Sequence, residues 1–134
     1  VQAQILELLL KLQQPFSMGL VLITHDMGVV ADTAQQVIVQ YAGQQVEKRS
    51  AQGLFHHPSH PYTAALLSAL PERAPSTGLL PTIAGIVPGQ FDRPPGCLFA
   101  PRCQHQQARC LTEVPRLTST HDGAVRCFYP LESV

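Results

Sequence analysis

The stretch GLVLITHDMGVV, residues 19–30, decides the fold of this chain. Five apolar or β-branched residues, 20–24, follow Gly19 and run directly into His25 and Asp26. A short apolar run bounded by a glycine predicts a buried strand. Asp26 suits the start of a following helix, because its carboxylate accepts from free N–H groups of the first turn. His25 then lies at the carboxyl end of a strand, where open α/β sheets bind ligands. A histidine that merely ends a strand is the alternative, and this stretch alone leaves it open.

The segments on either side of this stretch predict the rest of an α/β unit. Residues 1–12 have the spacing of an amphipathic helix, which Pro15 ends because proline cannot donate to the helical ladder. A helix, a short loop and a buried strand form half of a parallel-sheet unit. Residues 37–41 and 44–48 predict a hairpin, because the Ala-Gly pair between them suits a tight turn. Gln40 lies inside the first of these strands, so we expect a buried amide that needs a partner.

Residues 51–70 form a second unit, in which the helical pattern of residues 63–70 stops at Pro71. Three histidines lie just before this helix: His56, His57 and His60. Clustered histidines can bind a metal, but this loop is broken by proline and lacks the i, i+4 geometry of a helical site, which favours a structural role. Residues 71–95 are rich in proline and glycine, which predicts an extended connector.

The chain has four cysteines, with five, six and sixteen residues between them: Cys97, Cys103, Cys110 and Cys127. Four thiols at this spacing can form two disulfides, a four-cysteine zinc site or the ligand set of an iron–sulfur cluster. The paired spacing typical of zinc sites is absent, and spacing fixes neither connectivity nor metal, so unmetallated thiols stay an alternative. Three arginines beside the cysteines could offset the charge of thiolates or simply be solvated: Arg102, Arg109 and Arg126.

The composition excludes several functions. Nine basic residues balance nine acidic ones among 134 residues, so no net charge draws the chain to nucleic acid. No apolar run of about 18 residues occurs that could span a bilayer, and the first residues lack the features of a signal peptide. The G-x-x-x-x-G-K-[ST] phosphate loop is also absent, so we expect the chain by itself not to hydrolyse ATP. The chain begins inside a helical pattern, as an excised fragment or a truncated reading frame would.

Three motifs together resemble one family: LITHD, HPYTAALLSALP and the cysteine pattern GCLFAPRCQHQQARC…RCFYP. They are similar to the ATP-binding subunits of ABC importers for dipeptides and oligopeptides, and the similarity covers nearly the whole chain. The resemblance implies an α/β fold. Residues 1–50 would be the C-terminal piece of a P-loop-type ABC ATPase core, with a helix, a parallel strand, a helix and a strand pair. Residues 51–134 would be a proline-rich, loop-rich extension with a four-cysteine site at 97–127.

The resemblance also implies roles for particular residues. His25 corresponds to the histidine that contacts the γ-phosphate of ATP and helps place the attacking water, in a complete subunit that also binds Mg²⁺. Cys97, Cys103, Cys110 and Cys127 correspond to cysteines that hold a 4Fe–4S cluster in some relatives, with zinc as the alternative. Four positions depart from the family pattern: Gln35-Gln36, Gln40 and Arg49 replace Asp-Arg, Met and Gly. Arg49 puts in doubt a turn that would use positive φ.

By the same resemblance, the chain is part of the ATP-hydrolysing subunit that powers peptide import, peripheral to the cytoplasmic face of the inner membrane. Its expected partners are the missing N-terminal half, a second ATPase subunit, two membrane permease subunits and an extracytoplasmic peptide-binding protein. Two alternatives stay open at this point. One is a stand-alone iron–sulfur or zinc module, and the other is an inactive, truncated remnant.

Overall fold

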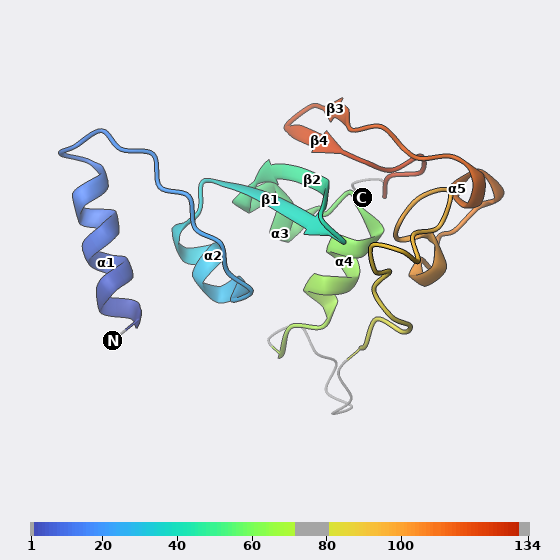
Figure 1. The fold of residues 1–134 in the computed structure, drawn as a ribbon. Coiled ribbons are helices and arrows are strands. Elements are labelled where there is room, and N and C mark those ends of the chain that lie inside the picture. Colours follow the sequence, from blue (N-terminus) through green and yellow to red (C-terminus); the bar gives the residue numbers. More distant parts are fainter. Residues whose placement is uncertain (1, 72–80, 132–134) are drawn as a thin grey trace. The chain divides into compact units, whose positions relative to one another are not determined.

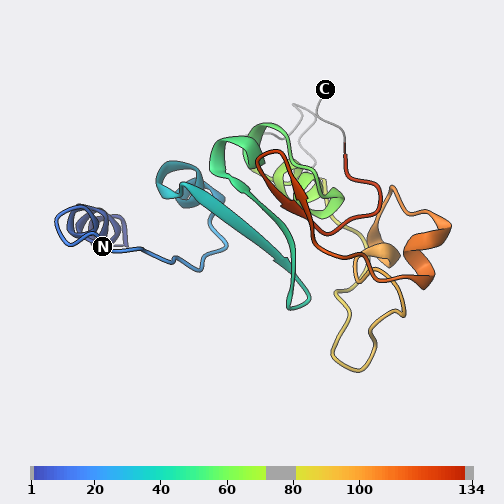
Figure 2. The same cartoon turned by 90° about the horizontal axis from the view of Figure 1, so that it is seen from above.

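The structure, a computed structural model, describes residues 2–71 and 81–131, which fall into two units (Figure 1, Figure 2). The first unit is Val1–Thr33 and the second is Ala34–Val134. The first residue of the first expected helix and residues 72–80 of the expected connector lie outside the described residues.

The first unit begins with α1, Gln2–Gln13, the amphipathic helix that the sequence predicts. On its polar face, Oε1 of Glu7 and Nζ of Lys11 are 2.7 Å apart. Four of its apolar side chains are exposed: Ile5, Leu8, Leu9 and Leu12. A helix with one apolar face is stabilised mainly by covering that face with another element. The described part of this unit does not provide that cover.

The strand predicted at residues 20–24 does not form in the described structure. This segment has no regular secondary structure, and Val21 and Ile23 are 88% and 95% exposed. A strand pairs its N–H and C=O groups with a neighbouring strand, and the described part of this unit contains none. The expectation of a buried parallel strand is therefore wrong for this chain as it stands, because the described residues of the first unit include no neighbouring strand.

Helix α2, Met27–Thr33, begins at the predicted cap. Oδ1 of Asp26 accepts from the backbone N–H groups of Gly28 at 3.0 Å and Val29 at 3.2 Å. The backbone N–H of Asp26 in turn donates to Oγ1 of Thr24 at 3.0 Å. These bonds hold the chain on both sides of His25, whose own side chain is exposed.

The second unit is built on a four-stranded antiparallel sheet with strand order β1–β2–β4–β3 (Figure 1). Strands β1, Gln36–Tyr41, and β2, Gln44–Ser50, form the predicted hairpin. Both turn residues have positive φ, 48° at Ala42 and 76° at Gly43. This combination gives a two-residue turn the twist that matches the strands.

Two residues that depart from the family pattern have environments other than those expected. Gln40 is exposed between the buried Val39 and Tyr41, because alternate residues of β1 face opposite sides of the sheet. The expectation of a buried amide is therefore wrong. Arg49 lies within β2 opposite Val37, so strand pairing continues through this position and the doubt about a turn here is confirmed.

Two strands of three residues complete the sheet, β3 at Thr118–Thr120 and β4 at Gly123–Val125. No pattern in the sequence predicts these two strands. Strand β4 pairs with β2, and a Cβ at Gly123 would overlap the carbonyl oxygen of Lys48. Glycine at this position therefore allows the two backbones to approach.

Short helices follow the hairpin and lie in the C-terminal loops: α3 is Ala51–His56, α4 is Pro61–Ser68, η2 is Ala100–Arg102 and α5 is Ala108–Thr112. Helix α4 begins and ends two residues earlier than predicted, because Pro61 suits a first helical turn, whose N–H groups have no helical acceptor. None of the described helices is long and apolar enough to cross a membrane.

An aromatic cluster joins β1, α4 and the loop between the first two cysteines. Its members are Tyr41, Tyr62 and Phe99, with ring centroids 4.8 to 5.4 Å apart. Leu54 of α3 and Leu67 of α4 are fully buried in the same unit. The cysteine-bearing loops are thus attached to a packed core.

Candidate functional site: a cavity lined by four cysteines

The second unit brings all four cysteines together. They line one small cavity of about 20 Å³: Cys97, Cys103, Cys110 and Cys127. The first two flank η2, the third is buried in α5, and the fourth follows β4. Phe99, Pro115 and Phe128 are among the other residues that line the cavity. Cysteines from three parts of the sequence therefore line one small cavity.

Backbone contacts set the positions of the first three thiols. The N–H of Cys97 donates to the carbonyl of Cys110 at 2.8 Å, which ties the first loop to α5. A Cβ at Gly96 would overlap the same carbonyl oxygen, so this close approach depends on glycine. The N–H of Cys103 donates to the carbonyl of Ala100 at 3.1 Å and closes the η2 turn.

Burial determines the charge state of these thiols in the metal-free chain. It raises the pKa of Cys97 and Cys103, and it raises the pKa of Cys127 to about 11. Neighbouring thiols of the cavity raise the same pKa values further, which reflects how near the sulfurs are to one another. Backbone hydrogen bonds act in the opposite direction, from Phe99 and Ala100 to Cys97 and from Tyr129 to Cys127.

The cysteines are free thiols in this structure. Among the described residues, no group of three or more His, Cys, Asp or Glu side chains has an arrangement that could hold a metal ion. The set of donors nevertheless suits a thiophilic metal. Four thiols share one cavity, and backbone hydrogen bonds reach several of the sulfurs, as they do around protein iron–sulfur clusters.

The three arginines beside the cysteines hold loops in place. Nε of Arg126 donates to the carbonyl of Gln45 at 2.8 Å. Arg102 donates to the carbonyl of Ala84 at 2.8 Å. Nε of Arg109 lies 3.0 Å from a carboxylate oxygen of Glu113. Their contacts are with carbonyls, a carboxylate and aromatic rings, so the idea that they offset thiolate charge gains no support from this geometry.

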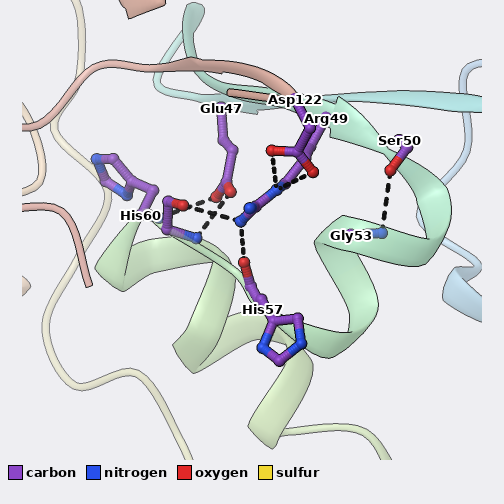
Figure 3. Close-up of polar contacts among 8 residues, drawn as sticks. Glu47, Arg49, Ser50, Gly53, His57, His60 and Asp122 are labelled. Atoms are coloured by element: carbon purple, nitrogen blue, oxygen red, sulfur yellow. Dashed lines mark hydrogen bonds and ion pairs between the residues drawn. The ribbon is translucent and has the colours of Figure 1, made fainter. Parts of the chain in front are cut away.

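Figure 3 shows a partly buried polar cluster around β2 and the start of α4, which sequence reasoning missed. Glu47 of β2 is 1% exposed, and its two carboxylate oxygens accept from the N–H groups of Ser59 at 2.8 Å and His60 at 2.9 Å. Arg49 reaches the carboxylate of Asp122 at 2.8 Å and also donates to the carbonyl of His57. No local sequence pattern predicts these contacts, because the partners are distant in sequence.

His60 belongs to this cluster and also lines the cysteine cavity. Its Nδ1 accepts from the N–H of Tyr62 at 3.0 Å and so caps α4. Burial lowers the pKa of His60 to about 4, and a hydrogen bond with the backbone of Arg126 opposes that shift. His60 is therefore neutral near pH 7. The two other histidines just before this helix, His56 and His57, are exposed. The three histidines therefore lie in different environments.

Thr63 offers a direct test of packing beside this cluster. It is fully buried in α4, and its hydroxyl has no hydrogen-bond partner among the described residues. We expect Thr63→Val to leave the free energy of unfolding unchanged or to raise it by up to about 1 kcal/mol, because an unsatisfied hydroxyl is replaced by a methyl group. Urea denaturation followed by circular dichroism measures this change. Thr63→Ser, which keeps the hydroxyl and loses a methyl, should instead be less stable by about 1 kcal/mol. A Thr63→Val variant less stable than Thr63→Ser would contradict this description.

The fold and the cavity are those of a mixed α/β chain in which the β1–β2 hairpin and α4 support a cysteine-bearing C-terminal region. Residues 46–110 match the family described as oligopeptide/dipeptide transporter, C-terminal region. The resemblance to peptide-importer ATP-binding subunits is confirmed by this match and by the relatives below.

Individual relatives extend the match over almost all of the chain. The dipeptide transport ATP-binding protein DppD of Escherichia coli (strain K12) is 53% identical over 133 residues, which is 98% of this chain and 41% of the relative. DppD of Haemophilus influenzae is 48% identical over 98% of this chain and 40% of the relative. The oligopeptide transport ATP-binding protein AppD of Bacillus subtilis (strain 168) is 46% identical over 96% of this chain and 39% of the relative. The chain thus spans about two fifths of the length of these relatives.

Proposed function

We propose that this chain is part of the ATP-binding subunit of an ABC importer for dipeptides or oligopeptides. The observation that carries the proposal is the similarity of 98% of the chain to DppD, which is named as a dipeptide transport ATP-binding protein. Similarity over both units favours an importer subunit over a stand-alone metal-binding module, which would need only the second unit.

The first unit supports the proposal through its exposed apolar surfaces. The apolar face of α1 and the segment at residues 20–24 lack cover in the described structure. In a complete subunit, we propose, residues 20–24 become a parallel strand between strands supplied by the rest of the subunit. His25 then lies at the carboxyl end of that strand and contacts the γ-phosphate of ATP, next to bound Mg²⁺. The proposed division into an ATPase part, residues 1–50, and an extension, residues 51–134, follows the same scheme.

The partners follow from the same proposal. They are the remaining part of the ATP-binding subunit, a second ATP-binding subunit, two permease subunits and an extracytoplasmic peptide-binding protein. The assembled subunit would lie on the cytoplasmic face of the membrane. ATP and Mg²⁺ are the proposed ligands of the complete subunit. The chain by itself lacks the phosphate loop that holds them.

A chimera tests the function. In Escherichia coli DppD, the region that aligns with this chain is replaced by residues 1–134, and the initial rate of labelled dipeptide uptake into cells is measured. We expect uptake comparable with that of unaltered DppD. The matched control is DppD with the region deleted. Uptake no faster than in that control, with the chimera present at normal abundance, would contradict the proposal.

We further propose that the four cysteines hold a 4Fe–4S cluster, with a zinc ion as the alternative. The cavity that they share and the backbone hydrogen bonds at their sulfurs support this proposal. A cluster would supply a covalently bonded staple for a loop-rich region, or one-electron redox chemistry. The chain's own residues bring the four cysteines to one cavity.

The metal proposal predicts a visible result. Anaerobically prepared protein should be brown with broad absorption near ~400 nm, the expectation for cysteine-ligated clusters. Cys103→Ser should remove this absorption. It should leave the circular dichroism of the protein largely unchanged, because one ligand is lost without removing core packing. About one zinc per chain in a colourless preparation would select the zinc alternative. Protein free of both metals would show that the four thiols are not a metal site.

A further inference from the structure

An arginine directly precedes three of the four cysteines, in the pairs Arg102–Cys103, Arg109–Cys110 and Arg126–Cys127. None of these arginines is among the described residues that line the cysteine cavity. Two of them, Arg102 and Arg126, instead donate hydrogen bonds to carbonyl groups of other segments. Each of these two arginines therefore connects the backbone next to a cavity cysteine with another part of the second unit.

Arg126 joins the segment before Cys127 to β2 and to the loop before β3. Its guanidinium donates from Nε to the carbonyl of Gln45 at 2.8 Å and from Nη1 to the carbonyl of Pro115 at 3.2 Å. Its backbone N–H donates to the carbonyl of Val46 at 2.8 Å. Pro115 itself lines the cysteine cavity. Because one planar group contacts two segments, it fixes Arg126 and, through the peptide bond, the backbone of Cys127.

Arg102 makes contacts of the same kind next to Cys103. It is the last residue of η2. Its Nε and Nη2 donate to the carbonyls of Ala84 and Ile83, each at 2.8 Å. Its Nη1 donates to the hydroxyl of Tyr41 in β1 at 3.3 Å. Three nitrogens of one side chain thus hold η2 against β1 and against the segment that leads to the first cysteine.

We infer that Arg102 and Arg126 are positioning residues for the thiols of Cys103 and Cys127, each holding the cysteine that follows it at the cavity. The inference rests on the proposed metal site for its purpose, because ligands that are held in place beforehand lose less conformational freedom when a metal binds. Its test uses the metal-free protein. An arginine that only stabilises the fold acts on all the thiols alike, whereas a positioning residue acts on its own cysteine.

The two arginines serve as controls for each other. Arg126→Ala removes the side-chain hydrogen bonds next to Cys127 and leaves those of Arg102 in place. Arg102→Ala does the reverse. A third variant, Arg93→Ala, removes an arginine that donates to the carbonyl of Ala42 at 3.0 Å and has no cysteine beside it in sequence. It controls for the loss of an arginine–carbonyl contact with the same hairpin.

The readout is the rate of alkylation of each thiol by N-ethylmaleimide in the reduced, metal-free 134-residue chain, resolved by mass spectrometry. We expect Arg126→Ala to accelerate alkylation of Cys127 by about tenfold, the factor for loss of buried hydrogen bonds from a local opening equilibrium. Cys103 should react at its original rate. Arg102→Ala should show the opposite selectivity, and Arg93→Ala should change neither rate. For either arginine, equal acceleration of both thiols, or rates like those of Arg93→Ala, would overturn the inference.

Arg126→Lys separates positioning from charge. Lysine keeps the positive charge, but its single nitrogen cannot take the place of the arginine fork at the carbonyls of Gln45 and Pro115. We expect Cys127 in this variant to react faster than in the original chain and no faster than in Arg126→Ala. A rate equal to that of the original chain would assign the effect to charge and overturn the inference.

A second arm uses the proposed metal. The original chain, Arg126→Ala and Arg93→Ala are incubated anaerobically with ferrous iron and sulfide, and the absorption near ~400 nm is recorded. We expect the original chain and Arg93→Ala to gain this absorption, and Arg126→Ala to gain much less of it. An Arg126→Ala variant as brown as the original chain would also count against the inference. If the original chain takes up no iron, the cluster proposal fails, while the alkylation rates still decide the role of the arginines.

Discussion

Replacing His25 by alanine in the DppD chimera is expected to lower the rate of ATP hydrolysis by ~10²–10⁴ while ATP binding persists. This range is the usual loss when a positioned polar group at a site of developing charge is removed. Hydrogen bonds of Asp26 lie on both sides of His25, and the His25 side chain is exposed, as the proposed contact with a ligand requires. A side chain kept out of the packing on a fixed backbone is available to a ligand.

The measurement needs a histidine control. His56 of α3 is also exposed, and it has no role in the proposed function. His56→Ala should hydrolyse ATP at the rate of the parent chimera. If His25→Ala retains most of the activity, or if it loses ATP binding along with hydrolysis, the assignment of His25 to the γ-phosphate is wrong.

Removing the carboxylate of Glu47 is expected to have the largest effect on stability, a loss of about 3–5 kcal/mol for Glu47→Ala. Two backbone N–H groups, those of Ser59 and His60, lose their acceptors inside the protein. The carboxylate also lies at the N-terminus of α4, where the helix dipole favours a negative charge. A loss of this size would unfold many small domains.

Two further variants calibrate this result in urea denaturation. Glu47→Gln keeps the shape and one good acceptor, so it should fall between Glu47→Ala and the original chain. Glu113→Ala removes an exposed carboxylate paired with Arg109 and should cost less than about 1 kcal/mol. A Glu47→Ala variant no less stable than Glu113→Ala would show that the buried hydrogen bonds contribute little.

Local signals made part of the fold predictable. The hairpin follows from alternating residues around Ala42 and Gly43, and the start of α2 follows from the Asp26 side chain. Both depend on residues within a few positions of each other. Their conformational preferences therefore do not depend on contacts with distant parts of the chain.

Long-range pairing could not be predicted in the same way. Strand β4 has three residues and pairs with β2, more than 70 positions earlier in the sequence, so no hydrophobic period reveals it. For residues 20–24 the sequence predicts a strand that the structure does not contain. Their apolar pattern is typical of a buried strand, but a strand needs neighbours that the described chain does not supply.

Some residues of the candidate site could likewise be predicted from the sequence, and others could not. The cysteines and His25 could be singled out because their residue types have distinctive chemistry and recognisable motifs. Glu47 and His60 could not be connected with each other, because their hydrogen bond arises from the contact between β2 and the start of α4. Buried polar contacts of this kind depend on the folded arrangement rather than on spacing.

The central claim is that this chain supplies a working region of a peptide-importer ATP-binding subunit. The most direct measurement is the rate of ATP hydrolysis by the purified transporter that contains the DppD chimera. The account predicts a rate comparable with that of the unaltered transporter and well above that of a transporter whose DppD lacks the region. A chimera that assembles with its partner subunits and yet hydrolyses ATP no faster than the deletion would contradict it.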